Sequence, residues 1–374
     1  MSFEIIRLGN ISDVPALEWD ALAQGHPLVS HAYLEAMEST HCAVERTGWT
    51  PQHLILRRSG AIRAAMPLYA KTHPWGEYVF DHAWARAYEH YGMEYYPKLV
   101  CAVPFTPVPG PRILGHDHND RHTLVEAAKG MVQDQGYSSL HVLFPHEEDH
   151  RVLERAGLLF RSNVQFHWEN RGYADMDGFL AAMSQQKRKK LRQERRKLHE
   201  ADIRFHWLTG SEIDSATLRF LYLCYVQTYF DHGNAPYLNL DFFERIYDRL
   251  GDTLVIVLAE RNGVPIAAAL NIRHGDRLFG RYWGCKEFVP GLHFETCYLQ
   301  GIEYCLAHGI SVFEGGAQGV HKLARGMLPV RTVSAHWIDD PVFGRAVADF
   351  LEREGRLIDS YLQEMLEHSP FRRM

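Results

Sequence analysis

The chain has 374 residues, of which 46% are hydrophobic and 12% aromatic, so it can form two packed domains and is not a disordered chain. Its 40 Lys and Arg stand against 46 Asp and Glu, and the formal net charge of −6 argues against a general nucleic-acid coat while leaving local basic patches open. The first residues lack the pattern of a signal peptide, and no segment approaches the roughly 20 apolar residues of a membrane span. The six cysteines show no Cys-x-x-Cys spacing, so we expect reduced thiols and a cytoplasmic protein.

The first half of the chain predicts a meander of three strands. Apolar alternation indicates strands at 53–58, 61–69 and 77–82, and an aromatic, proline-rich insertion follows at 88–111. Beyond the insertion, the pattern predicts a helix with Asn119 as its N-cap and Gly136 as its stop. This helix and the elements after it are expected at 119–135 (helix), 140–144 (strand), near 147–156 (helix) and 164–168 (strand).

Residues 187–199, KRKKLRQERRKLH, contain eight Lys and Arg and a single Glu, a composition that favours a helix. Leu191 and Leu198 lie seven positions apart and form one narrow apolar stripe. The segment therefore either joins two domains as a solvated helix or contacts the phosphates of an RNA or a cofactor.

The second half repeats the meander and extends it. Strands are predicted at 253–259, 265–272 and 277–283. A helix then follows, because apolar residues recur with a 3.6-residue period up to a stop at His308-Gly309. The apolar positions of this helix are Phe294, Cys297, Tyr298, Gly301, Ile302 and Cys305.

The loop at 284–293 leads to the N-terminus of that helix, where unpaired amides favour an anion such as a pyrophosphate. A buried strand, SVFEGG at 311–316, and a glycine-rich basic turn come next. This order indicates mixed sheets rather than the strict alternation of a Rossmann fold, and the chain has no G-x-G-x-x-G or Walker lysine loop.

Long strings of the sequence resemble one bacterial protein family. They include TGWTPQHLILR and VPFTPVPGPRIL in the first half, and QFHWEN, KRKKLRQERR, RYWGCKEFVPGLHFETCYLQ and FEGGAQGVHKLARG in the second. The family is described as predicted N-acyltransferases or peptidoglycan biosynthesis/recognition proteins, related to the Fem peptidyltransferases of the GNAT superfamily. The resemblance implies an α/β (α+β) fold with tandem GNAT-like domains and mixed central sheets. The expected parts are a first domain at 1–175, a basic helical connector at 176–210, and a second, donor-binding domain at 211–374.

The resemblance also implies a donor site in the second domain. In GNAT domains a splayed fourth strand binds the pantetheine of an acyl-CoA, and the following loop and helix N-terminus bind its pyrophosphate. The residues expected to bind the cofactor are Arg281, Tyr282, Trp283, Lys286, Gly291, Leu292, His293 and Arg325. The loop CKEFVPGLH departs from the Q/R-x-x-G-x-G/A signature of that family, and the Fem relatives, which also lack it, take an aminoacyl group from tRNA. Acyl-CoA is therefore the favoured donor, and aminoacyl-tRNA is the alternative.

Transfer of an acyl group to an amine requires a base, donors for the oxyanion, and an acid or cation for the leaving group. Glu314, at the end of a buried strand, is a candidate base or a member of a buried salt bridge. Glu295, in the first turn of the helix, is a candidate base or a helix cap. In the Fem relatives a Lys after a Gly-Gly strand end assists transfer, and Lys322 and Arg325 flank the matching position. The candidates for catalysis are thus Glu314, His321, Lys322 and Glu295.

No covalent nucleophile is expected, because the chain has no G-x-S-x-G elbow and Cys285 has no defined His or Asn partner. The acceptor is expected to bind a polar and aromatic wall in the first domain, across a cleft between the domains, although the same residues could simply pack in a core. The residues expected to bind the substrate are Tyr78, Asp81, His82, Trp84 and Gln318. No metal is expected, because the clusters at 116–118 and 146–150 lack the spacing of a zinc site.

The sequence favours an N-acyltransferase that uses an acyl-CoA donor, an amine acceptor and direct attack. An aminoacyl-tRNA-dependent peptidyltransferase is the second interpretation, with tRNA contacting 187–197. A non-catalytic module that binds a peptidoglycan-like or peptide ligand in a degenerate GNAT pocket is the third.

Overall fold

The chain, seen in a computed structural model that describes residues 3–317 and 319–372, divides by its internal contacts into two units. Unit 1 contains the described residues up to Asn163 together with Thr332–Asp359. Unit 2 contains Val164–Arg331 together with the described residues from Ser360 onward. The chain passes from one unit to the other within β9 (Leu159–Glu169), β15 (Leu328–Ile338) and α12 (Pro341–Glu367). The domain boundaries expected from the sequence, at 175 and 210, stay a prediction.

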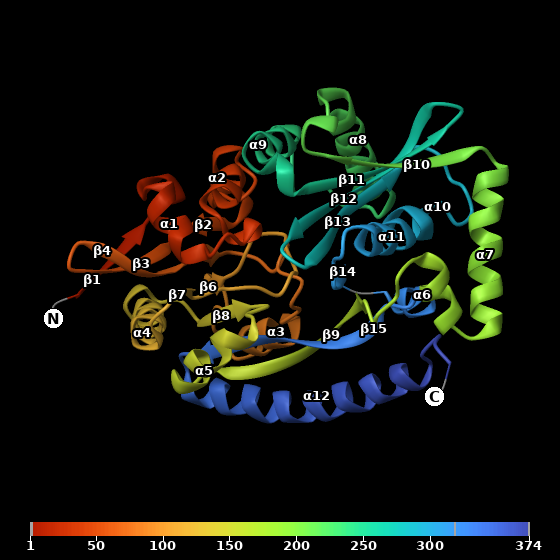
Figure 1. Ribbon diagram of the computed structural model, residues 1–374. Helices are drawn as coiled ribbons and strands as arrows, with labels where there is room; N and C mark the ends of the chain where they lie inside the picture. The colour runs from red at the N-terminus through yellow and green to blue at the C-terminus, as the bar shows by residue number, and fades with distance from the viewer. Residues whose placement is uncertain (1–2, 318, 373–374) are drawn as a thin grey trace. The chain divides into compact units, whose positions relative to one another are not determined.

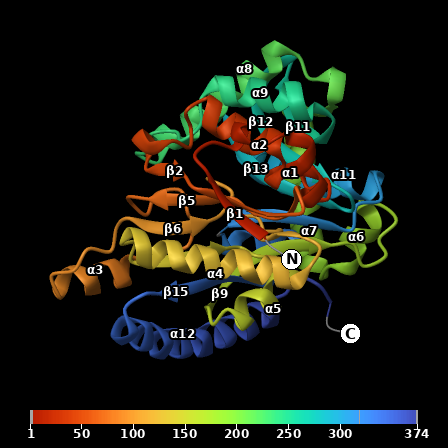
Figure 2. The ribbon, with the colours of Figure 1, turned by 90° about the vertical axis from the view of Figure 1, so that its left-hand side faces the viewer.

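Unit 1 builds β-sheet from the apolar segments of the first half. One sheet is antiparallel, in the order β1-β3-β4-β7, and further strands pair in the order β15-β8-β6-β5-β2, with β6 and β8 parallel. The new strands are β1 (Phe3–Leu8), β2 (Trp49–Pro51), β3 (His53–Arg58), β4 (Ala61–Met66), β5 (Leu68–Lys71), β6 (Lys98–Cys101), β7 (Leu114–Gly115) and β8 (Ser139–Leu143). The helices are α1 (Ala16–Ala23), α2 (His31–Ser39), α3 (His82–His90), α4 (His118–Gln135) and α5 (Glu147–Arg155), and α4 packs on β3, β4 and β8. Figure 2 shows α4 along its length.

The predicted meander of the first half is partly wrong. The strand expected at 61–69 is broken at Pro67, which has no amide proton for a ladder, so that β4 joins one sheet and β5 the other. The strand expected at 77–82 is absent from the described chain, because Glu77 and Asp81 turn toward the buried amine of Lys98 and Tyr78 adopts a φ of 59°.

The helix predicted at 119–135 is confirmed as α4, but its N-cap is Asp117 rather than Asn119. The Asp117 carboxylate accepts hydrogen bonds from the amides of Asn119 and Asp120, at 2.8 and 2.9 Å. Gly136, with a φ of 72°, ends the helix as expected.

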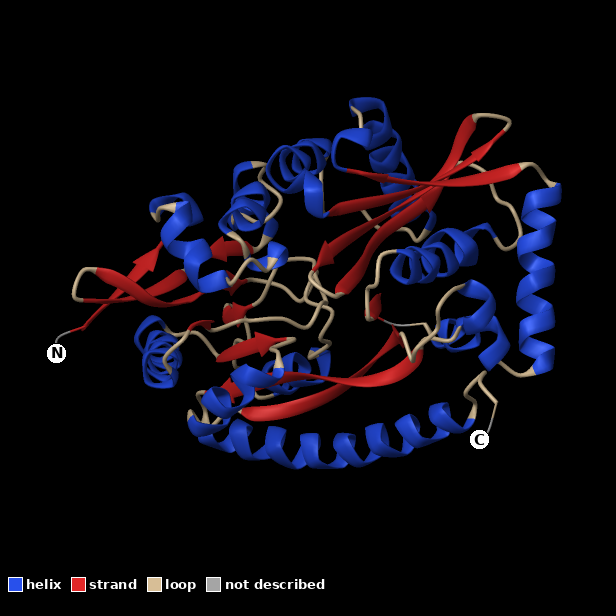
Figure 3. Ribbon diagram, viewed as in Figure 1, coloured by secondary structure: helices blue, strands red, loops and turns tan. Residues whose placement is uncertain are grey.

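Unit 2 contains the predicted meander of the second half, now β11 to β13, between two layers of helix. Strands pair in the order β10-β11-β12-β13-β14-β9, antiparallel except for β13 and β14. Figure 1 shows α8 and α9 on one side of β11–β13 and α10 and α11 on the other, and Figure 3 distinguishes the helices and strands. The strands are β10 (Ile203–Thr209), β11 (Leu254–Arg261), β12 (Val264–His274), β13 (Arg277–Cys285) and β14 (Val312–Ala317). The helices are α6 (Met176–Ala182), α7 (Gln185–Glu200), α8 (Ser215–Asp231), α9 (Leu240–Leu250), α10 (Leu292–Phe294) and α11 (Gln300–Ala307).

The helix predicted from the 3.6-residue period is confirmed, with one irregularity. A π-helical turn at Glu295–Leu299 joins α10 to α11. Tyr298, Ile302 and Cys305 are buried as expected, and Glu295 and Gln300 are buried on a second side of the helix. The basic segment is confirmed as α7, whose Leu191 and Leu198 are each 2% exposed.

All six cysteines lie among the described residues and are free thiols. Over 3–317 and 319–372, every helix is too short or too polar to cross a lipid bilayer. Within the same residues, His, Cys, Asp and Glu form no group of three that could hold a metal ion.

Candidate active site in unit 2

The strands β13 and β14 separate after a short paired stretch. They are parallel neighbours only from Arg277 to Phe279 and from Val312 to Glu314, whereas β13 continues to Cys285. At the point of separation Gly280 lies close to the partner strand, since a Cβ there would be 3.3 Å from the carbonyl oxygen of Glu314. The two strands therefore diverge where the sequence, through its family resemblance, predicts a splayed strand.

Basic and aromatic side chains gather beside this divergence, and we call Trp283, His293, Tyr298, His321, Lys322 and Arg325 the basic-aromatic cluster. His293 stacks on Trp283 with ring centroids 4.5 Å apart, and the Tyr298 hydroxyl lies 3.2 Å from Nε2 of His321. Burial, aided by the nearby cations, lowers the pKa of His293 to about 4, and burial also lowers the pKa of His321. Both rings are therefore neutral near pH 7.

Lys322 and Arg325 enter the cluster from a 3-10 helix at Val320–Arg325. Lys322 is 3% exposed, its Nζ donates to the carbonyl of Gly316 at 3.0 Å, and burial lowers its pKa to about 8. The guanidinium carbon of Arg325 lies 3.8 Å from the centre of the Phe294 ring. The cluster thus holds a lysine that can gain or lose a proton near neutral pH.

Glu314 lies at the end of the paired stretch and is 2% exposed. Its Oε1 accepts a hydrogen bond from Nη1 of Arg277 at 2.8 Å. Burial raises the pKa of Glu314 to about 7, although Arg277 opposes this shift. Nε2 of His167 lies 3.9 Å from Oε2 of Glu314, but burial lowers the pKa of His167 to about 3, so the ring is neutral and the contact is not an ion pair. The carboxyl group therefore titrates near neutral pH beside one cation.

Five of the eight residues expected to bind the cofactor do not join the cluster. Tyr282 packs against Tyr225 of α8, Lys286 lies with its amine 5.4 Å from the Phe220 ring, and Leu292 is in a core with Leu198. Arg281 donates from Nη2 to the Tyr282 hydroxyl at 3.2 Å. Gly291, with a φ of 90°, precedes α10, and Trp283, His293 and Arg325 belong to the cluster.

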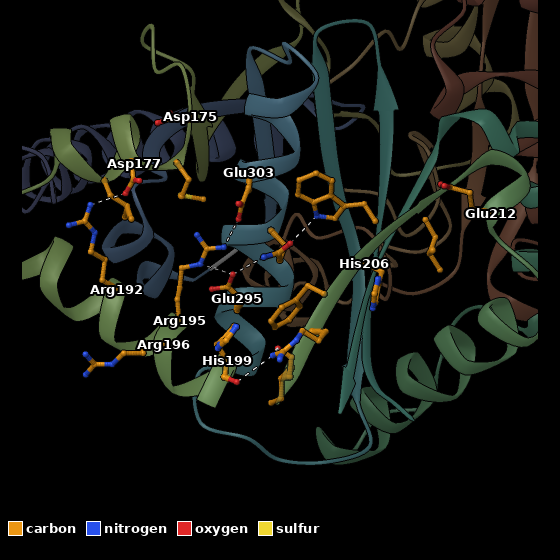
Figure 4. Close-up of a pocket in the computed structure, with 18 residues that line it drawn as sticks. Asp175, Asp177, Arg192, Arg195, Arg196, His199, His206, Glu212, Glu295 and Glu303 are labelled. Carbon is orange, nitrogen blue, oxygen red and sulfur yellow. Dashed lines mark hydrogen bonds and ion pairs between the residues drawn. The ribbon is translucent and has the colours of Figure 1, made fainter. Parts of the chain in front are cut away.

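Glu295 lies on another side of the same helix, away from the cluster. Its Oε1 accepts hydrogen bonds from Nε of Arg195 at 3.0 Å and from Nε2 of Gln300 at 2.8 Å. Burial raises the pKa of Glu295, although Arg195 opposes this shift. The carboxylate lines a cavity of about 1080 Å³ between α6, α7, β10 and α11, shown in Figure 4. The structure does not bring Glu295 together with Glu314, His321 or Lys322.

Four residues expected to bind the acceptor lie in unit 1. Asp81 is 2% exposed and pairs with the amine of Lys98, and the Trp84 ring packs edge-on against His336 at 4.9 Å. Tyr78 is half-buried and His82 is exposed. The packing of Asp81 and Trp84 fits the alternative of a core, and their role in binding stays a prediction. Gln318 lies outside the described residues.

Sequence reasoning missed two partners of the site, Arg277 and His167. Their positions follow from strand pairing, because His167 is opposite Glu314 in the β9–β14 register and Arg277 opens the parallel stretch of β13. A correct alignment of the three strands would have placed both residues beside the Glu314 carboxylate, but no local sequence motif indicates them.

The mixed sheets place the chain in the α/β fold class predicted from the sequence. A model of the FemAB-like family, described as peptidoglycan biosynthesis/recognition, matches residues 10–373, and the chain belongs to this family. The family and the fold support an acyltransferase-type enzyme that transfers acyl or aminoacyl groups.

Two solved structures illustrate the fold. FemX is 12% identical to this chain, with a TM-score of 0.55 over 90% of this chain and 97% of FemX. L-PGS from Bacillus licheniformis is 10% identical, with a TM-score of 0.55 over 94% of this chain and 98% of that one. At these identities the likeness extends to the fold alone. No curated protein matches the chain.

Proposed function

We propose that the chain is an N-acyltransferase, in which an amine acceptor attacks the carbonyl carbon of an activated donor directly. The observation that carries this proposal lies at the end of β14, where Glu314 closes the stretch paired with β13 and Nζ of Lys322 donates to the carbonyl of Gly316, two residues further along. Their pKa values, about 7 and about 8, are close to those that a general base and a general acid need at neutral pH. Few buried groups titrate in this range unless their surroundings shift them, and such groups concentrate at functional sites.

In the proposed reaction Glu314 takes a proton from the ammonium group of the acceptor. The freed nitrogen then forms a bond to the carbonyl carbon of the donor, and the carbonyl oxygen gains negative charge. When the bond to the leaving sulfur or oxygen breaks, Lys322 gives that atom a proton. The attacking nitrogen then loses its second proton to Lys322, which completes the amide and restores the charge of the lysine. Arg325 and the neutral ring of His321 supply further hydrogen-bond donors to the oxyanion or to an anionic part of the donor.

The donor that we favour is an acyl-CoA, held by the diverging strand β13 and by the loop that begins at Lys286. Aminoacyl-tRNA is the second candidate, favoured by the outer face of α7. The Lys190, Arg192 and Arg196 side chains there are 68, 55 and 68% exposed, and each pairs with a carboxylate, so that phosphates would have to compete with these ion pairs for the cations. Both donor classes occur in the cytoplasm, the location that we propose, and the acceptor that we propose is an amine of the peptidoglycan-precursor type, in keeping with the family description.

Ligand binding separates the two donors. We expect calorimetry with coenzyme A to give saturable binding, and a shift assay with tRNA at physiological salt to give none. The reverse result would select the aminoacyl-tRNA reaction, since binding that depends steeply on salt concentration indicates phosphate contacts. Native mass spectrometry of protein from its own cells provides an independent reading, because a retained coenzyme or RNA names the donor class.

The rate of transfer should show a bell-shaped dependence on pH. Glu314 must be deprotonated, so activity rises as the pH passes about 7, and Lys322 must be protonated, so activity falls as the pH passes about 8. Glu314→Gln should remove the rising limb and lower kcat by about 10²–10⁴-fold, the contribution of one general base. A profile that is flat from pH 6 to 9 would contradict these roles.

The same substitutions test the third interpretation, a non-catalytic binding module. Glu314→Gln, His321→Ala and Lys322→Met should abolish transfer one at a time in proteins that keep their far-UV circular dichroism. If each variant still binds its ligand and the parent transfers no acyl group with either donor, the chain is a binding module and not an enzyme.

A further inference from the structure

Two adjacent residues of α7, Glu194 and Arg195, lie on the side of this helix that faces the rest of unit 2. Leu191 and Leu198 mark that side by their burial, and positions 194 and 195 are three or four residues from both, which is one helical turn. Arg196 lies on the outer side, with its side chain 68% exposed. The single acidic residue within 187–199 is therefore turned inward, together with one arginine.

Glu194 contacts the 3-10 helix that carries His321 and Lys322. Its Oε2 accepts a hydrogen bond from Nη2 of Arg325 at 3.0 Å, and the Arg325 side chain is 7% exposed. The guanidinium carbon of Arg325 also lies over the Phe294 ring. Arg325 thus contacts both a carboxylate of α7 and an aromatic ring of the helix at 292–307.

Arg195 contacts that second helix. Its Nε donates to Oε1 of Glu295 at 3.0 Å, and its Nη2 donates to Glu303, about two turns further along the helix. Figure 4 shows both carboxylates turned toward Arg195. Gln300 joins the network, because its Nε2 donates to Glu295 and its Oε1 accepts from the indole of Trp207 at 2.9 Å.

The two anchored elements are the two walls of the basic-aromatic cluster. The helix at 292–307 supplies His293 and Tyr298, and the 3-10 helix supplies His321, which Tyr298 meets at 3.2 Å. Neither Glu194 nor Arg195 belongs to the cluster itself. One turn of α7 therefore contacts both walls through ion pairs, Glu194 with Arg325 and Arg195 with Glu295, in which one partner is buried.

We propose that Glu194 and Arg195 are positioning residues for the transferase site. Glu194 orients Arg325, and Arg195 fixes the helix that presents His293 and Tyr298. This inference rests on the proposed function, because it assigns α7 the task of setting the geometry of that site. It also connects α7, a basic helix with exposed cations, directly to the residues of the proposed site.

The first test observes the Arg325 side chain without using activity. In protein labelled with ¹⁵N-arginine, the Nε–H resonance of Arg325, assigned through Arg325→Lys, should be shifted upfield by the Phe294 ring. Glu194→Gln should return it toward the position of free arginine, and Glu194→Asp should restore part of the shift. The matched control is Glu200→Gln, which removes the carboxylate of the exposed Arg196–Glu200 pair, 3.5 Å apart on the same helix, and should leave the resonance unchanged.

The second test measures transfer with the donor that the binding experiments select. Glu194→Gln and Arg195→Met should each lower kcat/KM by about tenfold or more, mainly through kcat, since a displacement of about 1 Å in a site can cost a hundredfold. Arg195→Lys, which keeps a cation beside Glu295, should recover part of the loss even if Arg195→Met folds poorly. Glu200→Gln should equal the parent.

The outcomes separate the two proposals. If the parent transfers acyl groups and Glu194→Gln matches it in both resonance and kcat/KM, the positioning role is wrong while the function stands. A resonance that moves without a change in kcat/KM also overturns the positioning role. If the parent transfers nothing with either donor, the proposed function has failed, and the inference built on it falls as well.

Discussion

Lys98 of unit 1 is a buried amine on which a pair of buried carboxylates depends. Its Nζ donates to Oε2 of Glu77 at 2.8 Å and to Asp81, and all three side chains are at most 2% exposed. Lys98→Met preserves the length of the side chain but leaves both carboxylates without their cation. Removing one partner of a buried ion pair costs about 3–5 kcal/mol. We expect a loss of this size in the free energy of unfolding, measured by urea denaturation at pH 8 and followed by circular dichroism.

The loss should depend on pH in a defined direction. Burial already raises the pKa of Glu77 to about 7 in the presence of Lys98, and removing the cation raises it further. A carboxyl group with a raised pKa in the folded protein stabilises the fold only while it stays protonated, so stability falls as the pH rises above its value of about 4.3 in the unfolded chain. Lys98→Met should therefore be less destabilising at pH 5 than at pH 8.

The control is Lys129→Met, since Lys129 pairs at 3.1 Å with Glu126, whose side chain is 44% exposed. Its loss should cost about 1 kcal/mol or less. The double variant Glu77→Gln/Lys98→Met should recover part of the stability, because it removes one of the two uncompensated charges. If the free energy of unfolding of Lys98→Met is within about 1 kcal/mol of the parent's at pH 8, or falls further below the parent's at pH 5, Lys98 does not stabilise the two buried carboxylates.

Two further predictions concern stability. Gly284→Ala should lower the free energy of unfolding by about 1–3 kcal/mol, because the added Cβ would lie 1.9 Å from the carbonyl oxygen of Cys224. Gly130→Ala, which has open space in the middle of α4, should instead raise the thermal midpoint slightly. Equal thermal midpoints for the two variants would refute the packing of α8 on β13. His141 and His336 are fully buried, and their Nδ1 atoms lie 2.5 Å apart, so burial holds both pKa values well below 6.5. The unfolded chain binds more protons than the folded one below that pH, so stability should drop as the pH falls from 7 to 5, and His336→Asn should flatten the drop in denaturation curves recorded at each pH.

The second half of the fold could be predicted because its signals are local. The meander at 253–283, the helix beyond it and α7 all follow from periodicities within one segment. The first half was harder, since the segment at 77–82 alternates like a strand while Glu77 and Asp81 are drawn to Lys98, a residue about twenty positions later. Propensity cannot reveal a partner that only the tertiary structure supplies.

The site shows the same division. The sequence predicts that His293, His321, Lys322 and Arg325 lie together, and they do, because only β14 separates in the chain the two elements that carry them. Glu194 could not be foreseen, since a glutamate among eight cations gives no sign that it faces inward.

The π-helical turn at Glu295–Leu299 has a consequence for how this site can vary. Such a turn is equivalent to one additional residue in an α-helix, and each residue advances a helix by roughly 100°. Deleting one residue there would leave a regular helix with every side chain of the cluster still encoded, yet His293 and Phe294 would be rotated away from Tyr298. The alignment of the two walls therefore depends on the number of residues in this one turn. A one-residue deletion in the turn can disrupt the site even when every residue of the cluster is kept.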